Sequence, residues 1–296
     1  MADKAPGVSR RTRRLLLDYQ RGETTDYRIY RRMSERERRK QNQAILYRIS
    51  EDEREHAGIW KSYTGREVGA DRWKVCWYGL MSLLLGYTFV IKLMERNEHA
   101  TGAAYRALAL EIPEAETIVK REQAHEAELA DMLDEERLDY IGAMVLGLND
   151  ALVELTGALA GLTFALGDNR LVALAGIIIG VSATLSMAAS NYLAERADEN
   201  ENAIKSSLYT GAAYLATVFF LVLPYLLFPA GMYLRAFAVM LVVALLIIMF
   251  FNYYVSVAKS LPFFGRFTEM TGVSFSVIAV SFLIGLAAKR FLGIAV

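Results

Sequence analysis

Five long apolar segments in the second half of the chain restrict its possible folds more than any other feature of the sequence. They lie at about residues 141–166, 171–194, 208–228, 232–256 and 271–292. An α-helix needs about 20 apolar residues to cross a bilayer, and each segment provides enough. Lipid cannot hydrogen-bond to an open backbone, so such segments span as helices. We therefore expect five membrane helices, with the two termini on opposite sides of the membrane.

The first half of the chain has the opposite composition. Residues 1–140 contain 25 of the 33 lysines and arginines and 25 of the 33 acidic residues, which is typical of a domain in water. Arginines cluster between Ser9 and Arg14, but polar residues follow instead of the apolar core of a signal peptide. We expect a cytoplasmic domain over residues 1–139, a membrane domain over residues 140–296, and no nucleic-acid partner.

Apolar residues spaced three to four apart predict four amphipathic helices in the first domain. Their expected starts are Ser9, Ser34, Asp71 and Pro113. Ser34 and Glu37 have the spacing of a capping box, which favours Ser34 as the N-cap of the second helix. The third helix is expected to continue without a break from Asp71 to about His99.

The inward faces of these helices carry a repeated set of carboxylates and histidines. The set is Glu23, Glu53, His56, Glu95, Glu98, Glu122 and His125. Residues three apart on a helix point to the same side, so each Glu-x-x-His pair aims a carboxylate and an imidazole at one point. One carboxylate on each of two helices, with a Glu-x-x-His pair on each of the others, is the ligand set of a ferritin-like di-iron bundle. We predict an all-α fold with a Fe²⁺ di-iron site there, in which Mn²⁺ or Zn²⁺ can replace iron.

The helix order of residues 9–137 resembles the rubrerythrin branch of the ferritin-like superfamily. This resemblance implies that Glu98, one turn beyond Glu95, can exchange with Glu95 as a metal ligand. It leaves open whether the domain oxidises, stores or senses iron.

One segment of the first domain is unusually apolar. Val75 to Ile91 contains no charged residue over 17 positions, which is at the short end for a span. A span here would also split the ligand set across the membrane. We therefore expect a bundle helix whose surplus apolar face packs on a second subunit or on the membrane. Cys76, the single cysteine, excludes an intrachain disulfide, and we expect its side chain to be buried.

The first apolar segment contains two carboxylates, Asp150 and Glu154. Four residues apart, they lie on the same side of a helix, and ionisable groups at membrane depth usually line a pathway or a site. Met187, in the second segment, offers a thioether that is a soft ligand for a borderline divalent metal. Ordinary packing is the commoner role of such a methionine.

These residues carry a second resemblance. The run from Asp150 to Leu162, together with Ser186-Met187-Ala188 and Tyr192-Leu193-Ala194, is similar to the first two spans of the vacuolar iron transporter family. The order of bundle and spans resembles the membrane-bound ferritin proteins of bacteria and archaea. The family implies a homodimer in a lipid bilayer that exchanges Fe²⁺ or Mn²⁺ for protons and moves metal out of the cytoplasm.

Site residues follow from this resemblance by position. Asp150 and Met187 correspond to the in-membrane metal residues. We add Glu154 and Asn191 to the pathway; Asn191 stands where prokaryotic relatives commonly have glutamate. The link after the second span is short and holds acidic residues that form either a metal vestibule or a solvated loop. These are Glu195, Asp198, Glu199 and Glu201.

The sequence as a whole predicts a proton-coupled Fe²⁺/Mn²⁺ exporter in the cell (inner) membrane, with a cytoplasmic ferritin-like domain. Five basic residues flank the expected inner ends of the spans and four flank the outer ends, which hardly orients them. The charged, signal-free first domain places the N-terminus in the cytoplasm. A second hypothesis stays open: a di-iron oxidase or peroxidase whose spans only anchor and dimerise it.

Overall fold

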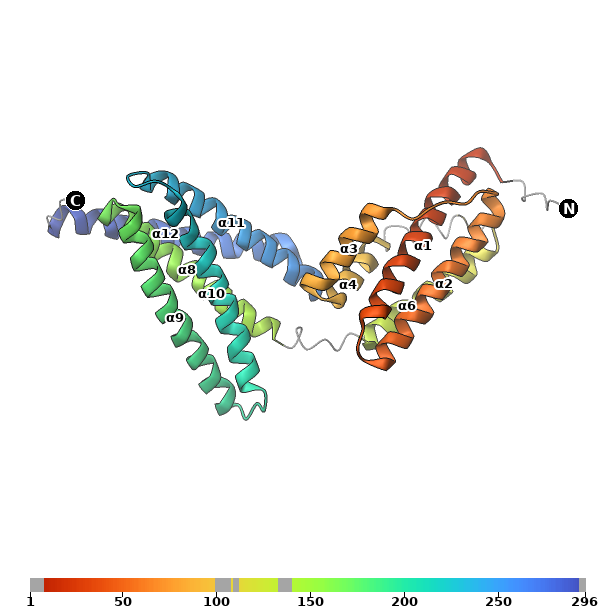
Figure 1. Cartoon of the computed structure of the whole chain (residues 1–296), viewed down its shortest axis with the longest axis horizontal. Coiled ribbons are helices and arrows are strands. Elements are labelled where there is room, and N and C mark those ends of the chain that lie inside the picture. The colour runs from red at the N-terminus through yellow and green to blue at the C-terminus, as the bar shows by residue number, and fades with distance from the viewer. Residues whose placement is uncertain (1–7, 99–107, 109–111, 133–139, 293–296) are drawn as a thin grey trace. The chain divides into compact units, whose positions relative to one another are not determined.

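The structure is a computed structural model that describes residues 8–98, 108, 112–132 and 140–292. All regular structure in these ranges is α-helical, in agreement with the predicted all-α class. The chain divides into two compact units, residues 1–135 and residues 136–296, and Figure 1 shows the helices of each unit.

The N-terminal unit consists of paired amphipathic helices. Its described helices are α1 (Arg10–Arg36), α2 (Lys40–Thr64), α3 (Arg72–Leu85), α4 (Tyr87–Glu98) and α6 (Glu114–Met132). α1 and α2 pack along much of their length, and α6 lies against α2. Ion pairs join α2 and α6: Arg121 donates to Glu55 at 2.8 Å, and Arg48 pairs with Glu128.

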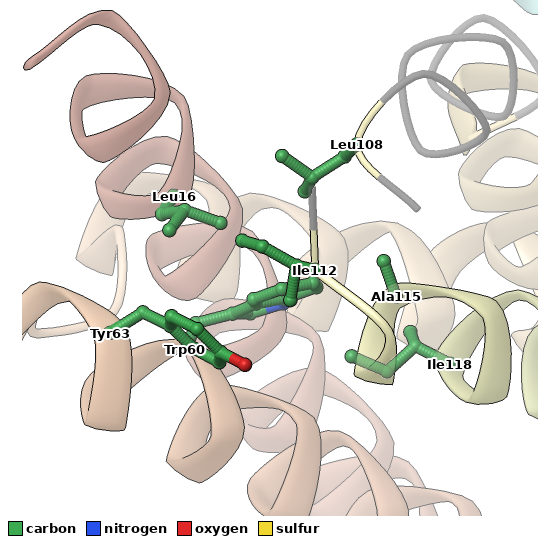
Figure 2. Packing of buried hydrophobic residues seen from close by; sticks show 7 residues of the cluster. All are labelled: Leu16, Trp60, Tyr63, Leu108, Ile112, Ala115 and Ile118. Atoms are coloured by element: carbon green, nitrogen blue, oxygen red, sulfur yellow. The ribbon is translucent and has the colours of Figure 1, made fainter. Parts of the chain in front are cut away.

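A compact apolar cluster holds one end of this unit together (Figure 2). Its buried members are Leu16, Trp60, Tyr63, Leu108, Ile112, Ala115 and Ile118. They come from α1, α2, α6 and the chain before α6, so the cluster fixes the spacing of three helices. Trp60 is fully buried in it, and its indole Nε1 donates to the Glu23 carboxylate at 3.3 Å. The apolar cluster therefore touches the inward carboxylates predicted from the sequence.

The predicted start of the second helix is wrong. α1 continues through Ser34 to Arg36, and the Ser34 hydroxyl donates to the Arg31 carbonyl inside that helix at 2.8 Å. α2 begins at Lys40 without a side-chain cap. The capping-box spacing occurred by chance within a helix, where a serine hydroxyl can bond to a preceding carbonyl instead.

The predicted third helix is interrupted. Gly86 has φ 93° and ψ 158°, a backbone conformation that ends α3 before α4 begins, and glycine is the residue that tolerates such a value. The break turns Leu84 outward, although the sequence pattern placed it in line with Thr88 and Ile91, which are both buried. With 14 and 12 residues, neither helix is long enough to span a bilayer, as expected.

The C-terminal unit contains five helices that are long and apolar enough to cross a membrane. They are α8 (Ile141–Leu166), α9 (Asn169–Ala197), α10 (Ala203–Leu227), α11 (Tyr233–Ala258) and α12 (Phe263–Leu292). The five predicted spans are thus confirmed as helices. α12 begins at Phe263 and not near residue 271. The apolar pattern missed its first two turns because they contain Arg266 and Glu269, whose charged side chains can reach the membrane surface.

α8 lies at the centre of this unit, in contact with the other four helices. Glycines allow the closest contacts. A Cβ atom at Gly147 would lie 2.3 Å from the backbone oxygen of Thr210 on α10, and one at Gly285 on α12 would lie 2.5 Å from the Gly161 oxygen. Small residues of this kind let membrane helices approach closely. The helix with two carboxylates therefore contacts every other helix of the unit.

Candidate metal centre and membrane pathway

Four of the predicted ligands meet inside the N-terminal unit. Glu23 from α1, Glu53 and His56 from α2, and Glu122 from α6 each offer a ligand atom, and these atoms all lie within 4.8 Å of one another. Glu23, Glu53 and His56 are buried, and Glu122 is half-buried. Carboxylate oxygens and an imidazole nitrogen at this spacing can hold one transition-metal ion.

The contacts of His56 indicate why a metal fits this cluster. Its Nδ1 atom lies 3.0 Å from Glu122 Oε1, 3.5 Å from Glu53 and 3.8 Å from Glu23. Both ring nitrogens are nevertheless buried, and neither has a hydrogen bond of acceptable geometry to another of the residues that the structure describes. Buried polar atoms normally have a hydrogen-bond partner. Three carboxylates gathered around one imidazole nitrogen are an arrangement that a metal ion can satisfy once the proton leaves the ring.

His125 from α6 completes this side of the cluster. Its Nδ1 atom lies 3.5 Å from Glu53 and 3.8 Å from Glu122, while its Nε2 atom is 2.9 Å from Asp52 Oδ2. The hydrogen bond to Asp52 directs Nδ1 toward the carboxylates, as in many metal sites where a carboxylate orients a histidine ligand. Both Glu-x-x-His pairs therefore point into one volume. The centroids of the His56 and His125 rings are 6.1 Å apart.

The charges within the cluster couple the protonation of its carboxylates to that of its histidines. Burial alone lowers the pKa of His56, but Glu122, Glu23 and Glu53 outweigh this and raise it to about 12. For His125, burial is likewise outweighed by acids, and the pKa rises to about 10.

The two central acids respond in opposite directions. Burial would raise the pKa of Glu122, but the two histidines lower it to about 2. Burial and the charge of Glu122 raise the pKa of Glu53 well above its usual value. One shared volume thus holds several protons that a cation can displace.

Two further residues of the cluster escaped the sequence analysis. Asp26 follows Glu23 by one turn, and burial together with the charges of Glu23 and Glu122 raises its pKa to about 8. Its spacing from Glu23 was the available signal. Asp52 precedes Glu53 directly, but adjacent residues on a helix point in different directions, so only the approach of α6 reveals its role. The side chains of Glu95 and Glu98 lie outside the described residues.

In the membrane unit, Asp150 and Glu154 lie on one side of α8. Asp150 is half-buried and Glu154 is exposed in the single protomer. The hydroxyl of Tyr214, a fully buried residue of α10, donates to Glu154 Oε2 at 2.9 Å. A carboxylate on the surface of an apolar span is costly when it faces lipid. Contact of Glu154 with lipid tails alone would therefore be unfavourable.

The contacts between helices bring Met187 near the level of Asp150. Gly147 of α8 packs on Thr210 of α10, and the next α10 residue, Gly211, packs on Ala188 of α9. These contacts align the first turns of α8 with the last third of α9. Met187 is half-buried there, within the same layer of the unit as Asp150.

A polar cavity of about 510 Å³ opens beside this layer. Its polar lining residues are Tyr140, Asn191, Glu195, Asn200, Asn202 and Ser206. Asn191 donates to Ser206 at 2.9 Å, and the Ser206 hydroxyl donates to Glu195 at 2.7 Å. Asn200 donates to the second oxygen of Glu195. A fixed carboxylate among amide and hydroxyl oxygens is an environment that suits a hydrated divalent cation.

Comparison with known proteins supports a part of this unit. Residues 141–203, which cover α8, α9 and the link to α10, match the family model of the VIT family. No curated protein and no solved structure was found to match the chain. The matched segment includes Asp150, Glu154, Met187 and Asn191. Together with the five apolar helices, the match indicates a multi-pass membrane protein of metal-ion transport.

Proposed function

We propose that the chain is a dimeric exporter that exchanges Fe²⁺ or Mn²⁺ for protons across the cell (inner) membrane. Its N-terminal unit is a ferritin-like di-iron domain on the cytoplasmic side, and its C-terminus lies on the opposite side. The observation that carries this proposal is the pair Asp150 and Glu154, two carboxylates in a span that matches the VIT family.

The energetic cost of these carboxylates supports an exchange mechanism. A charged Asp at the centre of a membrane helix costs about 2.5 to 3.5 kcal/mol on insertion scales. Two such acids one turn apart need protons or a divalent cation to offset their charge. Because metal ligands must be deprotonated, an arriving metal displaces protons and a departing one is replaced by them. Exchange then follows from the electrostatics of the pair.

The neighbouring groups have separate roles in this proposal. The Tyr214 hydroxyl orients Glu154. Met187 provides a soft ligand that favours Fe²⁺ over the harder Mg²⁺ and Ca²⁺. The cavity that contains Asn191 and Glu195 concentrates cations before they reach Asp150. The exposed side of Glu154 supports a homodimer, because a second copy of α8 would cover it.

The N-terminal unit captures metal before transport. Glu23, Glu53, His56 and Glu122 would hold one ion, and His125, with Glu53 and Glu122, would contribute to a second. Glu95 and Glu98 remain proposed ligands of this site. An iron pair bound by these residues would supply reactivity toward oxygen or peroxide. Asp52 and Trp60 orient the ligands His125 and Glu23, and the surrounding side chains keep the site largely dry.

A second candidate function is a membrane-anchored di-iron oxidase or peroxidase. The buried histidine and carboxylate cluster of the N-terminal unit favours it. An anchor has no need of intramembrane acids, however, so Asp150 and Glu154 favour transport.

Transport by the full-length protein in liposomes tests the proposal. A pH-sensitive dye inside the vesicles should report proton movement when Fe²⁺ is added outside. We expect Asp150→Asn to abolish this flux while leaving the fold and the metal content of the N-terminal unit unchanged, because the substitution removes the exchangeable charge at almost constant volume.

Asp168→Asn is the matched control for this experiment. Asp168 caps α9 through two backbone N–H groups, and asparagine caps a helix equally well, so transport should continue. If Asp150→Asn vesicles move Fe²⁺ at the parent rate, the carboxylates are structural and the anchored oxidase becomes the better account.

A further inference from the structure

α3 presents a broad exposed face of large apolar side chains. Trp73 is 75% exposed, Trp77 47% and Leu83 65%, and Leu80 and Leu84 are exposed beside them. The indole rings of Trp73 and Trp77 stack with centroids 6.3 Å apart. Contiguous apolar surfaces on soluble domains usually mark a binding surface.

Cys76 belongs to this face. It is exposed, so the expectation of a buried cysteine is wrong. Its neighbour Val75 lies on the buried side of α3, whereas Cys76 lies on the outward side.

The opposite side of α3 attaches the helix to the rest of the unit. Val75 is buried at 4% exposure, and the Arg36 side chain of α1 donates to the Gly79 carbonyl at 3.2 Å. The side chain of Asp71 caps the helix start at Trp73 and Lys74. α3 is therefore a well-anchored helix, and its outward apolar face is a fixed feature of the folded unit.

Basic side chains lie at the start of this face and along the attached side of α3. Arg72 and Lys74 lie at the start of α3, and Arg36 reaches Gly79 in the middle of it. Arg32 of α1 also reaches Gly79, within 4.0 Å of its Cβ position. All four side chains are exposed. Lys74 also lies close enough to Asp26 to lower the pKa of that acid, so the three arginines carry most of the outward charge.

The charge of this rim identifies the partner. Two acids close to it are already engaged: Asp71 caps α3, and Glu35 pairs with Arg31. A second copy of the same face would bring a second basic rim against the first, which is unfavourable. An anionic lipid surface has the complementary charge, and tryptophan prefers the boundary between headgroups and acyl chains.

The length of the chain keeps the unit near such a surface. Seven residues, 133–139, connect α6 to the tyrosine that precedes the first span. Even fully extended, this connection reaches no more than roughly 30 Å. The local concentration of lipid around the N-terminal unit is therefore permanently high.

We propose that α3 is a peripheral membrane-binding helix. Its tryptophans and leucines insert at the interface of a bilayer that contains anionic lipid, and Arg32, Arg36, Arg72 and Lys74 contact the headgroups. Amphipathic helices bind membranes by this combination of apolar burial and basic charge.

The distribution of tryptophan makes the proposal directly measurable. The chain has three tryptophans: Trp60 in the apolar core, and Trp73 and Trp77 on the α3 face. None lies in a span. Full-length protein is reconstituted in vesicles of phosphatidylcholine and phosphatidylglycerol with brominated acyl chains, which quench nearby indoles. We expect the emission to lose the share that comes from Trp73 and Trp77, and to lose less when phosphatidylglycerol is omitted.

A variant that keeps the face apolar is the matched control. Trp73→Phe with Trp77→Phe leaves only Trp60, whose emission should be insensitive to brominated lipid. Unquenched wild-type emission that is accessible to acrylamide would place the face in water and overturn the proposal. Unquenched emission combined with efficient Cys76 to Cys76 crosslinking between protomers would also overturn it, because a second copy would then cover the face. Equal quenching of the variant and the wild type would mean that the signal does not come from α3, and would contradict the proposal as well.

Discussion

One nearly dry volume in the N-terminal unit holds five ionisable side chains: Glu23, Glu53, His56, Glu122 and His125. The protonation of each side chain therefore depends on the charges of the others. The acids beside His56 and His125 overcome the effect of burial and raise their pKa values to about 12 and about 10. Both imidazoles are then protonated at neutral pH when no metal is bound. The nitrogens that a metal requires are occupied by protons.

We therefore expect metal binding at pH 7 to release protons from both rings. Because the folded pKa values lie above 7, the apparent affinity should rise as the pH increases toward about 10 and fall as it decreases. Calorimetry with Zn²⁺, which avoids redox chemistry, in buffers of different ionisation enthalpy measures the released protons. Binding heats that do not depend on the buffer would contradict this assignment.

Asp52 controls the orientation of His125 through the 2.9 Å contact with Nε2. We expect Asp52→Asn to weaken metal binding by about 10- to 100-fold, the usual effect of losing such a partner, without unfolding the unit. Metal competition with a chromogenic chelator measures the change. Glu51→Gln is the control, because Glu51 is one residue away but pairs with Arg31 and Arg54 outside the cluster. The metal affinity of this variant should equal that of the wild type.

At the scale of elements, the position of α8 depends on how closely other helices approach it. Gly147 allows the Thr210 backbone to lie where a Cβ atom would be 2.3 Å from its oxygen. This contact also sets the height of Asp150, one turn further along, relative to Tyr214.

We expect Gly147→Ala to destabilise the membrane unit by about 1 to 3 kcal/mol, the usual cost of overpacking, because backbone cannot move aside as a flexible side chain can. Gly142→Ala on the same helix is the control, since no atom of the described residues lies within 4 Å of its Cβ position. Thermal unfolding in detergent should separate the two variants. Equal melting temperatures would mean that α8 and α10 pack less closely than the structure describes.

The two units of the whole molecule can be observed separately, because all three tryptophans lie in the N-terminal unit and none in the spans. A ligand that binds only the folded state stabilises it by about 2.7 kcal/mol at 100 times its dissociation constant. Metal bound to the cluster should act on one unit alone.

Removal of metal by a chelator should therefore lower the unfolding temperature reported by tryptophan fluorescence. Unfolding of the spans, followed by circular dichroism after the first transition, should stay unchanged. The double variant His56→Ala and His125→Ala should lose the response to chelator. A shift of both transitions in parallel would show that the units do not unfold independently.

Much of the architecture follows from the sequence by periodicity alone. The spacing of apolar residues predicted the helices because 3.6 residues per turn place a fixed set of side chains on one face. The same rule predicted the inward positions of Glu23, Glu53, His56 and His125, all of which are buried. The length of the apolar segments predicted the five membrane helices, since the thickness of a bilayer sets their length.

Tertiary structure decided which partner each of these faces meets. Periodicity does not report the approach of α6, which turns Asp52 from a surface acid into the partner of His125. It does not report the break at Gly86 either, because a glycine within an apolar pattern is compatible with a continuous helix. Trp73 and its neighbours lie exposed on the short helix before this break. A sequence pattern determines which side of a helix is apolar, whereas contacts between distant segments determine what that side touches.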